Sequence, residues 1–184
     1  KAVADKIPGA KECSVLDIGG LYTNLIIIHS GNISEIVSFP SGGHHFTKSL
    51  SNETGLEIGH SNQLKKQYAS GITNEKETIK IANIFIGESA EWEKKFVDSL
   101  SGVSATDFFP KLMYMVGGGA QIPEIKNALE TKRWVAHVLS IGEIVITMLG
   151  AEDILSKGEL GAVLKGPDEI GLASLIINSV DNLT

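Results

Sequence analysis

The chain has 184 residues, with 20 glycines, one cysteine and a formal net charge of −6 at pH 7. A single cysteine excludes a disulfide within the chain, and an acidic balance without a basic run argues against nucleic-acid binding or attachment to a membrane by positive charge. No apolar run approaches the roughly 20 residues that span a bilayer. The length predicts one domain of ordinary size, and Cys13, as the only thiol, predicts a small core residue in a reducing compartment.

The first forty residues favour strands. Residues 13–18 and 22–29 are β-branched and apolar, with Gly19-Gly20 between them, which predicts two strands joined by a tight turn. Ser30-Gly31-Asn32 supplies hairpin residues, and residues 33–39 alternate well enough for a third strand. We therefore expect three consecutive antiparallel strands.

Helical spacing dominates the middle of the chain. Residues 44–54 predict a helix that stops at Gly55, and a polar helix is expected at about 61–69. From residue 77 to about 100 we expect one long helix, or two broken near Gly87. Its apolar stripe would comprise Ile79, Ala82, Ile86, Ala90, Glu93 and Val97, with Trp92 and Phe96 on a neighbouring face.

The last third mixes strands and helices. Residues 112–116 predict a short buried strand, and residues 123–130 predict a helix after three glycines. Residues 135–139 predict another strand, whereas 144–148 fit either a strand or a helical turn. Pro167 is expected to open a final helix that is apolar nearly all round.

This order of elements predicts an α/β domain over residues 1–184. Three antiparallel strands continued by strands that alternate with helices indicate a mixed sheet with helices on both faces. The core would span about 10–54 and 104–184, and a helical insertion would occupy about 55–103 as a satellite.

Two glycine clusters carry the possible chemistry. Asp17 ends a buried strand just before Gly19-Gly20, where free backbone N–H groups can bind an anion and the acid can hold hydrated Mg²⁺ against a polyphosphate. The alternative is that Asp17 and the two glycines form an ordinary structural turn that binds no ligand. Gly117-Gly118-Gly119 lies between a strand and a helix, where a ligand can approach the backbone closely. Ile122 stands where a dinucleotide fingerprint would have its third glycine.

Five motifs in order resemble a known family. They are Asp17 to Gly20 with Thr23, Gly42 to Thr47, Ser61 to Lys65, Gly117 to Ala120, and Gly171-Leu172-Ala173. Each motif alone is weak, but together they span nearly the whole chain. The sequence resembles the second half of an actin-like ATPase, in the branch of the cell-division protein FtsA and the pilus-assembly protein PilM.

The resemblance implies a ribonuclease-H-like domain, domain II of the family, that forms one jaw of a cleft for ATP and Mg. In the family the Asp17 position binds Mg²⁺ through water, and the backbone from Gly19 and Gly20 to Thr23 grips the β- and γ-phosphates. The backbone of the second loop would lie against adenosine and the α-phosphate; its residues are Gly117, Gly118, Gly119 and Ala120. Lys65 would face the adenine or ribose edge.

The chain departs from the family pattern at three positions. Asn62 stands where the family usually has a glutamate that accepts from a ribose hydroxyl, and it would do so without charge assistance. Leu21 and Tyr22 stand where the family prefers small or hydroxyl residues. If they point away from the cleft, backbone binding survives; if they do not, the site is occluded.

Three functions are compatible with these residues. The first is an ATP-binding domain of a cytoplasmic scaffold at the inner face of the membrane, which self-associates or recruits membrane-bound assembly proteins in cell division or in pilus and secretion assembly. This scaffold would need an N-terminal domain that these residues do not supply, and it would be at most a weak ATPase. Through this segment it would bind neither nucleic acid nor the membrane directly. The second is a degenerate interaction module without nucleotide, and the third is a small-molecule kinase of the same superfamily.

Overall fold

The computed structural model describes residues 9, 11–103, 108–140, 142–154 and 166–169. The strands are β1 (Cys13–Ile18), β2 (Thr23–His29), β3 (Asn32–Phe39), β4 (Leu112–Val116) and β5 (Val145–Met148). The α-helices are α1 (Gly43–Thr54), α2 (Ile58–Ala69), α3 (Glu75–Ser99), α4 (Pro123–Glu130) and α5 (Ala151–Ile154). Short 3-10 helices are η1 (Leu100–Gly102), η2 (Gly118–Gln121), η3 (Arg133–His137) and η4 (Pro167–Glu169).

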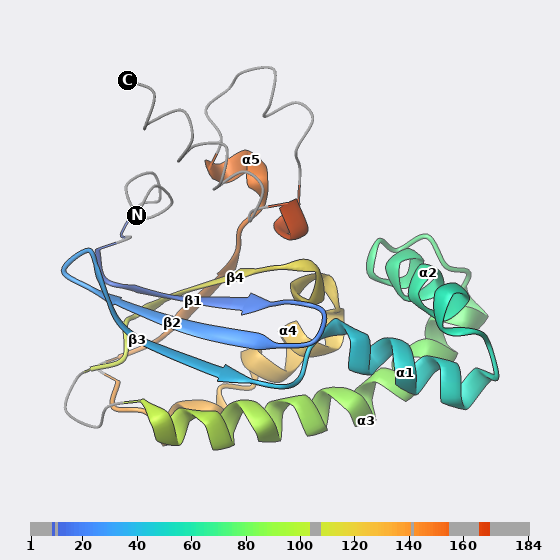
Figure 1. The fold of residues 1–184 in the computed structure, drawn as a ribbon, viewed down its shortest axis with the longest axis horizontal. Helices are drawn as coiled ribbons and strands as arrows, with labels where there is room; N and C mark the ends of the chain where they lie inside the picture. The colour runs from blue at the N-terminus through green and yellow to red at the C-terminus, as the bar shows by residue number, and fades with distance from the viewer. Residues whose placement is uncertain (1–8, 10, 104–107, 141, 155–165, 170–184) are drawn as a thin grey trace.

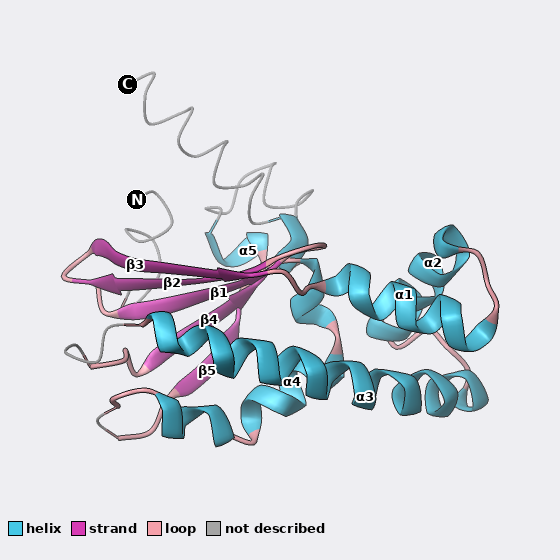
Figure 2. Ribbon diagram, turned by 60° about the horizontal axis from the view of Figure 1, so that its bottom comes forward, coloured by secondary structure: helices cyan, strands magenta, loops and turns pink. Residues whose placement is uncertain are grey.

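The strands form one mixed sheet in the order β3-β2-β1-β4-β5 (Figures 1 and 2). β2 pairs antiparallel with β1 and β3, whereas β4 pairs parallel with β1 and β5. Four of the five strands therefore end at the same edge of the sheet. In open α/β sheets that edge is where ligands bind.

The helices lie on both faces of the sheet and beyond its carboxyl edge. α3 and α4 cover one face, α5 lies on the opposite side, and α1 and α2 extend beyond the edge (Figure 2). Large side chains fill the layer between the sheet and α3, and Leu16, Trp92, Phe96 and Trp134 are fully buried there. The predicted mixed sheet and its three leading antiparallel strands are confirmed. No described helix is both long and apolar enough to cross a membrane.

The long helix α3 differs from expectation in which side it buries. It runs unbroken through Gly87 and begins at a capping box, in which the Asn74 side chain accepts from the Glu77 N–H at 2.9 Å. The buried residues are Ile81, Phe85, Ser89, Trp92 and Phe96. The predicted stripe was wrong, since Ile79 and Ile86 are exposed. The aromatic side prevails because large rings bury more apolar area than isoleucine and alanine do.

The predicted strand at 135–139 was also wrong. Residues Arg133–His137 form η3, because the fully buried Trp134 ring draws the chain inward and its Nε1 donates to the Leu129 carbonyl at 3.0 Å. The fifth strand is β5, which settles the ambiguity at 144–148 in favour of a strand. A short apolar run cannot distinguish these outcomes by periodicity alone.

Smaller differences occur at element ends. β2 begins at Thr23 and α2 begins at Ile58, three residues before the predicted start. Pro167 opens the 3-10 turn η4, and the rest of the predicted final helix lies outside the described residues. The C-terminal half of α3, within the predicted insertion, packs under the sheet, where Trp92 stacks on Phe96 at 5.5 Å.

A buried pair joins α2 to α4. The Tyr68 hydroxyl hydrogen-bonds to Glu124 Oε1, and Glu124 Oε2 has no hydrogen-bond partner among the described residues. Burial raises the pKa of Glu124 above its ordinary value of 4.5, and the hydrogen bond from Tyr68 offsets only part of that effect. The folded state therefore holds this proton to a higher pH than the unfolded chain does.

Replacing Glu124 tests this proton linkage. A raised pKa stabilises the fold below about pH 4.5, and that contribution is lost as pH rises through the folded value. We expect Glu124→Gln to gain stability relative to the wild type as pH rises from 4.5 to 7, measured by urea unfolding at several pH values. Glu91→Gln, an exposed carboxyl on α3, is the control. A difference that does not vary with pH would show that the Glu124 carboxyl is not shifted.

Candidate functional site

A cleft of about 300 Å³ opens at the carboxyl edge of the sheet. Its walls come from the β1–β2 turn, the start of α1, the end of α2, η2 and η4. The lining residues are Gly19, Gly20, Gly43, Lys65, Lys66, Ala69, Ser70, Gly118, Gly119, Gln121, Ile122 and Asp168. Both glycine clusters, about 100 residues apart in sequence, therefore meet at one cavity.

The first glycine loop, residues 19–22, is held by its own backbone and by α1. The Gly19 N–H donates to the Tyr22 carbonyl at 3.0 Å, which closes the turn. The Gly43 and His44 N–H groups donate to the Gly19 and Gly20 carbonyls at 2.9 and 2.7 Å. The amides at the start of α1 thus bind the loop, and a ligand would meet the loop instead of the helix terminus.

The second glycine loop, residues 117–119, lies directly against the end of β1. Gly117 has φ +89°, and a Cβ there would stand 2.5 Å from the Ile18 carbonyl oxygen and 2.6 Å from Asp17 Oδ1. Only glycine combines that conformation with that approach. Among the described residues, no hydrogen bond takes up the N–H of Gly20 or Gly118, so each loop has a donor for an anion.

Lys65 brings a positive charge to the cleft. Its Nζ donates to the Gly43 carbonyl and to Thr47 Oγ1, both at 2.8 Å. Burial, with a smaller effect from the neighbouring Lys66, lowers the pKa of Lys65 to about 8. An ammonium has three donors, so one remains for a ligand. The described ion pairs do not include Lys65, and its charge is compensated only by neutral oxygens.

Asp17 brings a negative charge behind the two loops. Burial raises the pKa of Asp17, and a hydrogen bond with the Asn24 side chain partly offsets the effect. The described ion pairs do not include this carboxylate either. The described residues hold no group of three or more histidines, cysteines or carboxylates fit for a metal. A lone carboxylate suits a hydrated Mg²⁺ that takes its other ligands from water and phosphate.

Five of the predicted site residues are absent from the lining of the cleft, namely Asp17, Thr23, Asn62, Gly117 and Ala120. The Thr23 and Ala120 side chains are fully buried, and Asn62 is exposed, with its Oδ1 3.4 Å from Thr47 Oγ1. Leu21 and Tyr22 are 59% and 55% exposed and are absent from the lining. Their bulk therefore does not fill the cleft.

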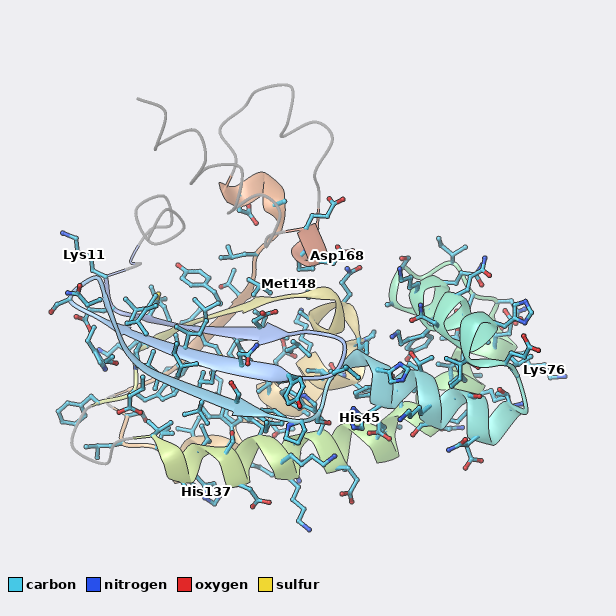
Figure 3. The ribbon with its side chains drawn as sticks, in the orientation of Figure 1. Lys11, His45, Lys76, His137, Met148 and Asp168 are labelled. Atoms are coloured by element: carbon cyan, nitrogen blue, oxygen red, sulfur yellow. The ribbon has the colours of Figure 1, made fainter. Side chains whose placement is uncertain are left out.

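Sequence reasoning missed the wall that η4 contributes. The Gly117 N–H donates to the Pro167 carbonyl at 2.8 Å, and Gln121 Nε2 donates to Asp168 Oδ1 at 3.2 Å. Figure 3 shows Asp168 near the carboxyl ends of the strands, on the face of the sheet where α5 lies. The Pro167-Asp168-Glu169 sequence signals a helix start, and only tertiary contact places its acid beside the second glycine loop.

Solved structures with the same architecture are distant in sequence. The PilM-PilN type IV pilus biogenesis complex matches with TM-score 0.67 and 16% identity, covering 95% of this chain and 48% of that chain. The ethanolamine utilization protein EutJ from Carboxydothermus hydrogenoformans matches with TM-score 0.57 and 19% identity, covering 80% and 48%. The activator of 2-hydroxyisocaproyl-CoA dehydratase from Clostridium difficile, with bound ADPNP, matches with TM-score 0.52 and 14% identity, covering 98% and 63%.

These likenesses establish the fold as that of the actin-like ATPases, an α/β ribonuclease-H-like domain. The chain spans about half the length of the PilM and EutJ chains it matches. No curated protein sequence matches it. The family model described as cell division protein FtsA matches residues 14–158, which is most of the chain. The chain therefore belongs to the FtsA family of actin-like ATPases.

Proposed function

We propose that this chain is the ATP-binding domain II of an FtsA/PilM-like scaffold protein. The observation that carries the proposal is the convergence of both glycine loops and Lys65 on one cleft at the carboxyl edge of the sheet. An ATP phosphate chain carries negative charge, which suits free backbone donors and a lysine that has no acidic partner among the described residues. A structural neighbour, the Clostridium difficile activator, was solved with bound ADPNP, which supports nucleotide binding by this chain.

The residues of the site would contact different parts of the Mg-ATP ligand. Gly20 and Gly118 would donate backbone N–H groups to phosphate oxygens, and the free donor of Lys65 would serve the nucleotide from the α2 side. Asp17 would hold Mg²⁺ through water, and the ion would neutralise charge on the phosphates. The exposed Asn62 would reach the nucleotide only at the cleft rim. Thr23 and Ala120 would contribute through their backbone alone, because their side chains are buried.

The biological role we propose is assembly at the inner face of the membrane, from the cytoplasm. The match to the FtsA family supports a role in cell division, and the likeness to PilM, solved with PilN, supports one in pilus or secretion assembly. Because the chain spans about half of its structural neighbours, an N-terminal domain of the same protein would supply the opposite wall of the cleft. Partners would be further copies of the protein or membrane-bound assembly proteins.

A second candidate function is an interaction module that binds no nucleotide. The observation that favours it is the exposure of Leu21 and Tyr22 on the turn that should carry phosphate. Exposed apolar side chains on a loop are suited to a protein partner. The loss of the family glutamate at Asn62 also weakens the ribose contact.

Titrating the full-length protein with Mg-ATP separates the two candidates. We expect saturable binding, and we expect Asp17→Asn to weaken it at least tenfold, because the amide cannot hold the hydrated Mg²⁺. The same substitution should raise the stability of the nucleotide-free protein at pH 7, since it removes a carboxylate whose pKa burial raises. Undetectable binding by the wild type would leave only the interaction module. Unchanged affinity in Asp17→Asn would overturn the Mg²⁺ assignment.

The charge of Lys65 gives a second, pH-dependent test. Its charged form predominates below a pKa of about 8, so we expect ATP affinity to fall as pH rises from 7 to 9. Lys65→Met should weaken binding roughly tenfold at pH 7 and remove most of this pH dependence. Lys76→Met is the control, because Lys76 lies at the far tip of α3, away from the cleft (Figure 3). Equal losses in the two variants would show that Lys65 does not bind the ligand.

A further inference from the structure

A buried hydrogen-bond chain lies beside the first glycine loop. The Thr23 hydroxyl donates to the Ser41 carbonyl at 2.6 Å and accepts from Trp92 Nε1 at 3.1 Å. All three residues are fully buried. The single proton of the Thr23 hydroxyl is already used, so this side chain is not free to donate to a phosphate.

The chain connects the two backbone segments that form this side of the cleft. Thr23 is the first residue of β2, directly after the loop of residues 19–22. Ser41 directly precedes Gly42 and Gly43, and the Gly43 and His44 N–H groups donate to the loop carbonyls. A Cβ on Gly42 would stand 2.5 Å from the Gly19 carbonyl oxygen, so the two segments are in van der Waals contact. The Thr23–Ser41 bond fastens them together one residue beyond that contact.

Trp92 gives the chain a rigid anchor. Its ring stacks on Phe96 with centroids 5.5 Å apart and 14° between planes, and lies 5.8 Å from Phe39. Phe96 in turn contacts Trp134 at 5.5 Å, so the indole is one member of a packed aromatic row under the sheet. Side chains packed at this density hold their rotamers, so the indole N–H has a fixed direction.

We propose that Thr23 and Trp92 are positioning residues of the first glycine loop. Through the Ser41 carbonyl they hold the loop against the start of α1, and they thereby set where the loop donors stand before any ligand arrives. Removing the Thr23 hydroxyl would leave the Trp92 indole N–H and the Ser41 carbonyl without this hydrogen-bond partner in the core. A buried polar group without a hydrogen bond destabilises the local structure, so the contact between the loop and α1 would loosen. The positioning rests on observed contacts; its effect on nucleotide affinity rests on the proposed function.

Amide hydrogen exchange in the nucleotide-free, full-length protein tests the positioning directly. Thr23→Val keeps the shape and removes the hydroxyl, and Trp92→Phe removes the indole N–H. We expect the Gly43 and His44 amides to exchange at least tenfold faster in either variant. Thr23→Ser, which restores the hydroxyl, should return the exchange to within about twofold of the wild type.

Two control variants separate positioning from general destabilisation. Trp134→Phe removes another buried indole N–H from the same aromatic row, one that donates to the Leu129 carbonyl, far from the loop in sequence. Ser41→Ala removes a hydroxyl that has no partner among the described residues and leaves the carbonyl in place. We expect both controls to stay within about twofold of the wild type at the Gly43 and His44 amides.

Mg-ATP affinity supplies the second measurement. We expect Thr23→Val and Trp92→Phe each to weaken binding about tenfold and the two controls to leave it within twofold. Unchanged exchange in both test variants, equal acceleration in Trp134→Phe, or no rescue by Thr23→Ser would overturn the proposal. If exchange responds as expected but the wild type does not bind Mg-ATP, the proposed function fails while the positioning of the loop stands.

Discussion

The parallel pairing of β1 with β4 is the constraint on which the site depends. It sets Asp17 opposite Val116, so that the two strands end together and their glycine loops leave from the same point. Gly117 then turns with its Cα against the Ile18 carbonyl, a contact that any side chain would prevent. Without that pairing, the two loops would be unrelated turns about 100 residues apart in the sequence.

The charges around the cleft are unfavourable to the folded chain by itself. Burial raises the pKa of Asp17 and lowers that of Lys65, which means that each group is held where its charged form is poorly solvated. Neither belongs to a described ion pair. Such arrangements cluster at functional sites, because a ligand of matching charge can relieve them. A magnesium–polyphosphate complex carries charges of both signs, so its metal ion would offset the charge of Asp17 and its phosphates would offset the charge of Lys65.

α3 ties the cleft to the rest of the molecule. It begins at the Asn74 cap, after α2 and away from the sheet, and ends under the sheet, where Trp92 stacks on Phe96. Phe85, near its middle, contacts Phe46 and Tyr68 edge to face and so joins α1 and α2. One continuous helix therefore supports both the helices of the cleft wall and the strands that carry its loops, which limits independent movement of the two.

Elements with local sequence signals could be predicted from the sequence, whereas the other elements depend on tertiary packing. A few adjacent residues specify the Gly-Gly turn, the hairpin and the helix end at Gly55. The bounds of the three leading strands and of α1 were therefore predicted almost to the residue. Trp134 was different, because a short apolar segment becomes a strand or a 3-10 turn according to what its ring packs against. The ordered motifs identified the family. The family pattern also predicted the two glycine loops and Lys65 as site residues, and the fold brings them to one cleft. Contacts between distant segments decide three further features, which no local pattern encodes. They are the position of Asp168 beside the cleft, the burial of the Thr23 side chain and the exposure of the Leu21 side chain.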